Sequence, residues 1–285
     1  MRPSGGAPIP GTTTGAPAPD ADVDLDRDLG LDLDLDLDRC TIADLQQAMT
    51  HGHLTSERLT LALLERIERL NPLLRAVTTV NPDAPALSRR SDALRRDGRA
   101  RGPLEGIPVL LKDNIGTADR QPTTAGSAAL LGARPDADAF LVRRLRAAGA
   151  VVLGKANMTE WADFRSEHSV AGWSATGGQA RNPYVLDRSP SGSSSGSAVA
   201  VAAGLAVAAI GTETDGSVVL PASVTSTVGF KPTRGLVSRG GIVPLSSRQD
   251  TAGPLARTVA DAALVLWAIH GPDPADPVTP PAADG

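Results

Sequence analysis

The chain has 285 residues, a net charge of −4 and a hydrophobic content of 41%, enough to bury a substantial core in one domain. Aromatic residues make up only 2%, and no basic stripe is interleaved with them, which argues against a nucleic-acid-binding surface. The single cysteine, Cys40, cannot form an intrachain disulfide. We see neither a secretion signal nor an apolar run long enough to span a membrane, so we expect a cytoplasmic protein without nucleic-acid or membrane partners.

The two ends of the chain have low-complexity compositions. Residues 1–40 hold nine Asp and three Arg, a charge of −6 that leaves +2 for the remainder. Residues 24–38 alternate Asp and Leu, a period that suits a strand, but one face of such a strand would stack repelling carboxylates. We expect residues 1–40 to be a disordered tail and the Pro/Ala-rich residues 276–285 to be a disordered end.

Residues 41–275 are predicted to form one α/β domain. Thr41 is expected to cap a short helix that Gly52 ends, and Thr55 a longer helix that ends at Asn71-Pro72. Further on, the apolar runs predict buried strands over Ile107–Leu111, Ala150–Leu153 and Leu205–Ile210, and helices over Ala137–Ala148, Ser197–Ala203 and Thr258–Trp267. Alternation of this kind indicates an α/β sheet.

Lys112 is unusual because it closes an apolar run in a chain that otherwise prefers arginine. Only Lys112, Lys155 and Lys231 are lysines, and the other 25 basic residues are arginines. A lysine can lose its proton, and burial can supply the shift of about three pKa units from ~10.4 that a neutral amine at pH 7 requires. Two interpretations stay open: a base beside serine hydroxyls, or a strand-end lysine paired with Asp113.

The Ser/Gly run of residues 191–197 admits several interpretations. It leads directly into an apolar helix, which a flexible linker does not, and it lacks the Gly-Lys-Ser/Thr ending of a phosphate-binding loop. Its Gly-x-Ser-x-Gly pattern would make Ser194 the nucleophile of a hydrolase elbow, but no strand precedes it and only His270 lies downstream. The four histidines are scattered, which supports neither a Ser-His-Asp triad nor a zinc site.

A second hydroxyl-rich turn, Gly211–Ser217, follows a predicted strand and places Ser217 where a sheet ends. Successive backbone N–H groups of a tight turn can converge on one point and form an oxyanion hole. An ordinary strand-to-helix turn is the alternative interpretation.

Three segments together resemble the amidase signature family, serine hydrolases that cleave carboxamides. They are Gly106–Ile115, Ser189–Ser197 and Gly211–Pro221, within a similarity that extends from about Thr41 to Pro277. Glu160–Arg165, Gly177–Tyr184 and Asp215 are most similar to the peptide amidase group, which removes the C-terminal amide of peptides. The resemblance implies a central mixed β-sheet covered by helices on both faces. Family members continue well past the equivalent of residue 285, so we expect the C-terminal part of the fold to be missing.

The resemblance also assigns roles to residues. Ser217 would be the nucleophile, Ser193 the bridging serine after a cis peptide bond, Lys112 the base, and Ser194 a support of the loop. The oxyanion hole would consist of the backbone N–H groups of Thr214, Asp215, Gly216 and Ser217. No cofactor or metal is implied, and the oligomeric state is left open. Ser191 and Ser195 replace two glycines of the family loop, and serine at 195 is compatible only if its φ is not positive.

The expected reaction is hydrolysis of a small amide or a peptide C-terminal amide to a carboxylate and ammonia through an acyl-enzyme. One alternative within the family is the glutamine-hydrolysing subunit of a tRNA amidotransferase, against which Glu160–Arg165 and Asp215 argue. Another is a catalytically inactive fragment that persists as an interaction protein.

Overall fold

The computed structural model describes residues 36–281, so the expectations for residues 1–35 and 282–285 lie outside the described residues. The helices are α2 (Ile42–Thr50), α3 (Ser56–Leu74), α4 (Ala84–Arg96), α5 (Phe140–Ala147), α6 (Ser195–Ala202), α7 (Val219–Val224) and α8 (Val259–Ile269), with short 3-10 turns η1 (Ala128–Leu130) and η2 (Glu160–Asp163). The strands are β1 (Val77–Val80), β2 (Pro108–Lys112), β3 (Val151–Ala156), β4 (Trp173–Ser174), β5 (Gly178–Gln179), β6 (Ala208–Glu213), β7 (Val228–Gly229) and β8 (Thr251–Ala256). None of the helices described is long and apolar enough to cross a membrane.

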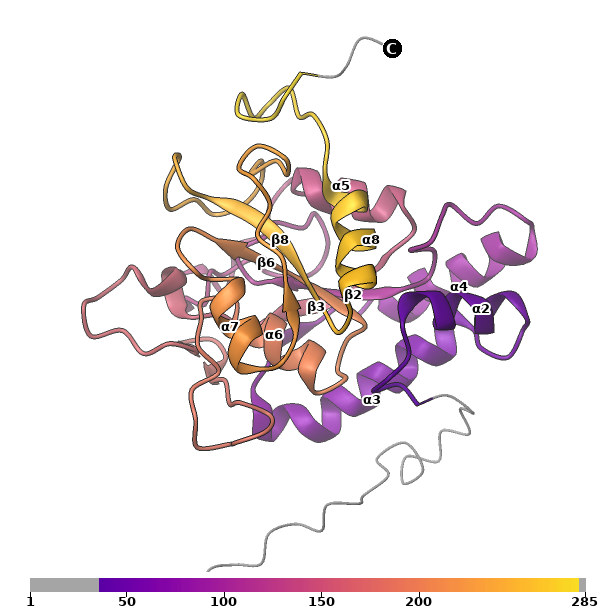
Figure 1. Cartoon of the computed structure of the whole chain (residues 1–285), viewed down its shortest axis with the longest axis horizontal. Coiled ribbons are helices and arrows are strands. Elements are labelled where there is room, and N and C mark those ends of the chain that lie inside the picture. Colours follow the sequence, from indigo (N-terminus) through magenta and orange to yellow (C-terminus); the bar gives the residue numbers. More distant parts are fainter. Residues whose placement is uncertain (1–35, 282–285) are drawn as a thin grey trace, which may run out of the picture. The chain divides into compact units, whose positions relative to one another are not determined.

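The central sheet has six strands in the order β1-β3-β2-β6-β8-β7. Strand β2 runs parallel to both β3 and β6, whereas the β1/β3, β6/β8 and β7/β8 pairs are antiparallel. Figure 1 shows β2, β3, β6 and β8 at the centre of the domain with helices around them. This arrangement confirms the predicted mixed sheet with helices. Because β2 and β6 are parallel neighbours, their carboxyl ends, Lys112 and Glu213, lie at the same edge of the sheet.

The predicted helix starts are confirmed by their capping bonds. The hydroxyl oxygen of Thr41 accepts the backbone N–H of Asp44, that of Thr55 accepts from Arg58, and that of Thr258 accepts from Asp261. Each bond satisfies one of the N–H groups that the first turn of a helix leaves unpaired. Local capping chemistry therefore sets where these three helices begin.

Several predicted boundaries are wrong by two or three residues, among them the start of α5, the end of β3, the end of α3 and the start of β6. Helix α3 continues through Pro72 to Leu74, which is 5% exposed, and ends only at Arg75, whose φ is 51°. The run Leu205–Val207 is buried but is a connection, and the strand begins at Ala208 and extends to Glu213. Apolar residues in a core connection cannot be distinguished from a buried strand by hydrophobicity alone.

Residues 36–40, which the composition placed in a disordered tail, are described with specific contacts. Asp38 forms an ion pair of 2.6 Å with Arg66, whose side chain is 2% exposed. The carbonyl oxygen of Cys40 accepts a hydrogen bond of 2.8 Å from Arg257. The ordered part of the chain therefore begins before Thr41.

The same holds at the other end, where residues 276–281 were expected to be disordered. Asp276 pairs with Arg239 at 2.6 Å, and the hydroxyl of Thr279 accepts the backbone N–H of Asp273 at 2.9 Å. The Asp276 pair lowers the pKa of that carboxyl to about 2, because the guanidinium stabilises its charged form. Ion pairing rather than apolar packing holds this segment, which is why its composition showed no packing signal.

Candidate active site

Lys112 is the last residue of β2, and its side chain is fully buried. Its Nζ donates hydrogen bonds to Ser193 Oγ at 2.7 Å and to the carbonyl oxygen of Thr212 at 3.0 Å. Burial lowers the pKa of Lys112 to about 7, while the carboxylates of Glu213 and Asp250 act in the opposite direction. Desolvation thus brings this amine into the range in which it can exchange protons near neutral pH.

The Ser/Gly run of residues 191–197, which we call the serine loop, leads into α6 and brings Ser193 to Lys112. The peptide bond between Gly192 and Ser193 is cis, and Ser191 has a φ of 59°. A Cβ on Gly192 would lie 2.2 Å from Thr159 Oγ1, so only glycine fits there. Ser195 has no positive φ and lies within α6, which meets the condition for serine at this position.

Ser194 ties the serine loop to strand β6. Its hydroxyl donates to the carbonyl oxygen of Thr212 at 3.1 Å and accepts the backbone N–H of the same residue at 3.2 Å. Thr212 therefore contacts both Lys112 and Ser194 through its backbone. One turn later, the hydroxyl of Ser197 donates to the carbonyl oxygen of Ile210 at 3.2 Å, so bonds from two serines hold the loop in register with the strand.

Ser217 lies in the turn between β6 and α7 and is 9% exposed. Its carbonyl oxygen accepts the backbone N–H of Ser194 at 3.1 Å, whereas its hydroxyl has no hydrogen-bond partner within residues 36–281. The structure thus joins Lys112 to Ser193 directly and brings Ser217 to the same loop through its backbone, without a bond between the two serine hydroxyls.

The turn that carries Ser217 has free backbone donors. No acceptor within the described part of the chain bonds to the four N–H groups of Thr214, Asp215, Gly216 and Ser217. Glu213 satisfies the next two donors: its Oε2 accepts from Val218 N at 2.7 Å and from Val219 N at 3.0 Å. Gly216 has a φ of 76°, which glycine adopts without steric cost.

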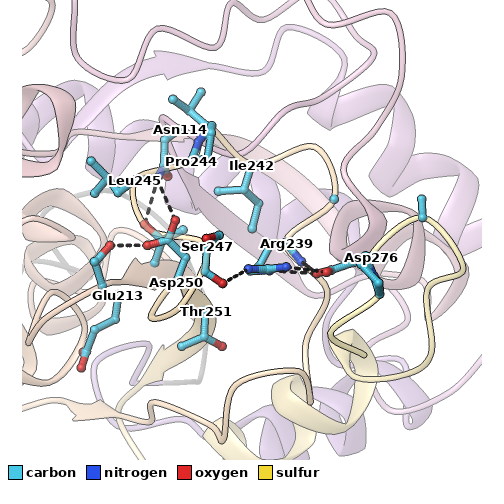
Figure 2. Close-up of a pocket in the computed structure, with 16 residues that line it drawn as sticks. Asn114, Glu213, Arg239, Ile242, Pro244, Leu245, Ser247, Asp250, Thr251 and Asp276 are labelled. Carbon is cyan, nitrogen blue, oxygen red and sulfur yellow. Dashed lines mark hydrogen bonds and ion pairs between the residues drawn. The ribbon is translucent and has the colours of Figure 1, made fainter. Parts of the chain in front are cut away.

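A cavity of about 310 Å³ adjoins this turn and is drawn in Figure 2. Its walls are partly apolar and partly charged. They comprise Asn114, Thr212, Glu213, Thr214, Arg239, Gly240, Ile242, Val243, Pro244, Leu245, Ser247, Asp250, Thr251, Ala275, Asp276 and Pro277. Within the described residues, no group of three or more His, Cys, Asp or Glu side chains could hold a metal ion.

Sequence reasoning missed three residues that contact this region. Thr212 offers its backbone to Lys112 and Ser194, and Asn114 Nδ2 donates to Thr212 Oγ1 at 3.0 Å. Asp250 accepts from the hydroxyl of Thr214 at 2.6 Å. Thr212 lies inside the hydroxyl-rich turn and could have been found from it, whereas nothing local distinguishes Asp250.

Comparison with known proteins identifies relatives over most of the chain. Residues 58–284 match the amidase family. A probable amidase from Arabidopsis thaliana is 52% identical over 246 residues, which are 86% of this chain and 48% of the relative. A glutamyl-tRNA(Gln) amidotransferase subunit from Chloroflexus aurantiacus is 45% identical over 242 residues, or 85% of this chain and 48% of that protein.

A solved structure agrees with these matches. The native peptide amidase from Stenotrophomonas maltophilia superposes with a TM-score of 0.84 and 62% identity, covering 86% of this chain and 51% of that one. The chain therefore spans about half the length of the relatives it matches. Since the family match covers well over half of the 285 residues, the chain belongs to the amidase family.

Proposed function

We propose that the protein is a cytoplasmic amidase that hydrolyses a small amide or a peptide C-terminal amide to a carboxylate and ammonia. The observation that carries the proposal is the fully buried Lys112, whose Nζ lies 2.7 Å from Ser193 Oγ and whose pKa is lowered to about 7 by burial. A buried amine of this kind is a suitable general base, because its pKa lies near the working pH. Similarity to the peptide amidase supports the peptide substrate.

In the proposed reaction, neutral Lys112 accepts the hydroxyl proton of Ser193 as Ser193 accepts that of Ser217. Ser217 Oγ then forms a bond to the amide carbonyl carbon. The tetrahedral intermediate collapses, the C–N bond breaks, and the nitrogen leaves as ammonia with a proton returned through the same two residues. Water, activated by the same relay, cleaves the ester to Ser217 and releases the carboxylate. The two serine hydroxyls must approach for this step, and such bonds often tighten only when substrate binds.

The oxyanion of the intermediate would be held by the turn 214–217. Its four backbone N–H groups have no acceptor within residues 36–281, so they are available to a ligand. Donors fixed in place before the reaction stabilise developing charge without reorganisation, and one such donor is typically worth about 10²–10³ in kcat. Ser194 would support this geometry through its two bonds to Thr212.

Glutamine hydrolysis within a tRNA amidotransferase is the second candidate. The relative from Chloroflexus aurantiacus, 45% identical over 85% of this chain, favours it. That function would require partner subunits to receive the ammonia. Release of ammonia from glutamine only when partners co-purify would support it over the peptide amidase.

The test is release of ammonia by the purified chain from a peptide C-terminal amide, with glutamine and a small aliphatic amide in parallel. We expect release from the peptide amide and a rate that falls as pH drops through about 7, because Lys112 is then protonated. No release from any of the three amides would overturn the proposed activity for this chain. Activity without an ionisation near 7 would contradict the role of Lys112 as the base.

A further inference from the structure

Asp250 joins the turn 214–217 to a second turn that also borders the cavity. It directly precedes β8, and Glu213 and Thr251 form the last residue pair between β6 and β8. One residue beyond that pair, Asp250 Oδ1 accepts a hydrogen bond of 2.6 Å from the hydroxyl of Thr214. A side-chain bond thus continues the sheet pairing into the turn whose N–H groups are free.

The other carboxylate oxygen of Asp250 holds the second turn. Oδ2 accepts the backbone N–H groups of Leu245 at 2.7 Å and Ser246 at 2.9 Å. Leu245 and its neighbour Pro244 line the cavity, and Figure 2 shows them on its wall with Asp250 nearby. One carboxylate therefore bonds to both the proposed oxyanion turn and a wall of the adjoining cavity.

We propose that Asp250 is a positioning residue for the amidase reaction: it holds Thr214, and with it the N–H donors of the turn 214–217, in place relative to the segment 244–246, of which Pro244 and Leu245 line the cavity. The proposal rests on the proposed function. Hydrogen bonds to a charged acceptor are stronger than neutral ones, which suits a group that must fix two backbone segments at once. Small displacements of positioning groups have large kinetic effects.

Asp250 also acts on Lys112 through its charge. Glu213 on β6 and Asp250 before β8 are the two carboxylates whose negative charge favours the protonated form of Lys112 and raises its pKa against the effect of burial. Lys155, on the neighbouring β3, donates to Thr123 and to the carbonyl of Ile115. Asp113, which directly follows Lys112, accepts hydrogen bonds from the backbone N–H and the hydroxyl of Thr124. Removing the charge of Asp250 should therefore lower the pKa of Lys112 further.

Two variants separate the bond from the charge. Thr214→Val removes the hydroxyl but keeps the carboxylate, and we expect kcat to fall about tenfold or more with KM changed less than about threefold. The ionisation near 7 should stay in place. Asp250→Asn should lower kcat at least as much and also move that ionisation to lower pH, whereas Asp250→Glu should restore part of the rate. Thr60→Val is the matched control, because the Thr60 hydroxyl is buried in α3 without a partner among the described residues.

Hydrogen exchange gives a readout that does not depend on turnover. Thr214→Val and Asp250→Asn should both speed exchange at the paired ends of β6 and β8, and Asp250→Asn should also expose the amides of Leu245 and Ser246; Thr60→Val should do neither. Wild-type kcat in Thr214→Val, or unchanged exchange at the ends of β6 and β8 in both variants, would overturn the positioning role. If the wild-type chain releases no ammonia, the proposed function fails, and exchange still decides whether Asp250 holds the two turns.

Discussion

Lys112 and Lys155 occupy similar positions in the fold but have different surroundings. They lie on the neighbouring parallel strands β2 and β3, where Leu111 pairs with Lys155 and Lys112 with Ala156. Both side chains are fully buried, and burial is the main cause of a lowered pKa in each. The pKa falls to about 7 for Lys112 and to about 8 for Lys155.

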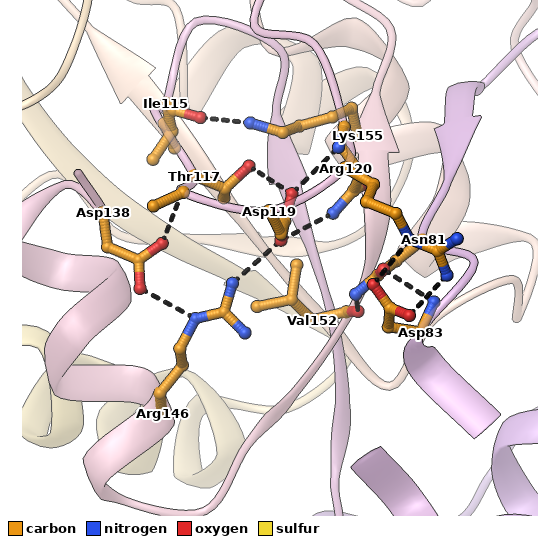
Figure 3. A network of polar contacts seen from close by, with 12 residues as sticks. Asn81, Asp83, Ile115, Thr117, Asp119, Arg120, Asp138, Arg146, Val152 and Lys155 are labelled. Atoms are coloured by element: carbon orange, nitrogen blue, oxygen red, sulfur yellow. Dashed lines mark hydrogen bonds and ion pairs between the residues drawn. The ribbon is translucent and has the colours of Figure 1, made fainter. Parts of the chain in front are cut away.

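The two lysines differ in the number of carboxylates whose charge acts on them. Lys155 donates to the carbonyl oxygen of Ile115 and to Thr123 Oγ1 and belongs to a network, shown in Figure 3, with Asp119, Asp138 and Arg146. Carboxylates including those of Asp113, Asp119 and Asp138 favour its protonated form. Two carboxylates act on Lys112. Each lysine donates to one hydroxyl and one carbonyl oxygen, but the Thr123 hydroxyl beside Lys155 donates its own proton to the carbonyl of Ile115, whereas the hydroxyl beside Lys112 belongs to Ser193, next to Ser194, which bonds to the backbone of Ser217.

Burial alone therefore does not suit a lysine to act as a base. Burial lowers both pKa values, but the carboxylates around Lys155 favour its charged form and raise its pKa in part. The hydrogen bonds of Lys155 join two segments of the fold. Lys112 instead contacts the hydroxyl of Ser193, in the loop that bonds to the turn carrying Ser217. We therefore expect substitutions of Lys112 to affect activity and those of Lys155 to affect stability.

The largest expected effect is on activity. Lys112→Ala and Ser217→Ala should each lower ammonia release from a peptide amide by at least about 10³-fold, because each removes a member of a unit that acts together. Lys231→Ala is the matched control, since Lys231 is exposed and, among residues 36–281, donates only to the carbonyl of Pro232. Either alanine variant retaining more than about a tenth of wild-type activity would contradict the assigned roles.

The next effect concerns stability and pH at Lys112. This lysine releases its proton near pH 10.5 when unfolded and near 7 when folded, so between these values the unfolded chain holds more protons and stability rises with pH. Methionine does not titrate. The free energy of unfolding of Lys112→Met minus that of wild type should therefore fall by about 3 kcal/mol between pH 7 and ~9.5. Urea unfolding of both proteins at the two pH values measures this, and a difference independent of pH would contradict the buried, neutral lysine.

The third effect, smaller than the other two, is a loss of stability on substitution of Lys155. Lys155→Met removes the donor that the carbonyl of Ile115 and the hydroxyl of Thr123 share and leaves them only the long bond of 3.4 Å to each other, so the free energy of unfolding should fall by about 2 kcal/mol. The kcat per folded molecule should remain near that of wild type, measured well below the unfolding temperature. If Lys155→Met kept wild-type stability but lost kcat, Lys155 would affect activity as Lys112 does, which would contradict the expected difference.

The smallest effect is expected at the exposed ion pair of the network in Figure 3, Arg120 with Asp83. Arg120 pairs with Asp83 at 2.5 Å, but the two side chains are 61% and 42% exposed. Solvent and salt screen such pairs, so Arg120→Gln should leave the thermal unfolding midpoint of the protein unchanged within error. A clear drop at physiological salt would show that the outer pair supports the buried part around Lys155.

Much of this fold could be predicted from local sequence. Thr41, Thr55 and Thr258 begin helices because their hydroxyls bond to backbone N–H groups three residues later, an interaction contained in a few residues. The end of α3 and the start of β6 could not, because Leu74 and Leu205 are buried in the folded chain and local sequence does not show which apolar residues continue a helix or strand. The site shows the same division. Lys112 and the two hydroxyl-rich turns stood out by residue type and motif, the separate roles of Ser193 and Ser217 came from the family resemblance, and Asp250 had no local signal.

The sequence by itself determined that a lysine ends an apolar strand and that two hydroxyl-rich turns follow it, since these features depend on neighbouring residues alone. Only the tertiary structure decided that Lys112 meets Ser193, 81 residues away, and that Thr214 meets Asp250, 36 residues away. The parallel pairing of β2 with β6 and the antiparallel pairing of β6 with β8 bring these residues to one edge of the sheet. Burial at that edge, which no single segment supplies, then lowers the pKa of Lys112.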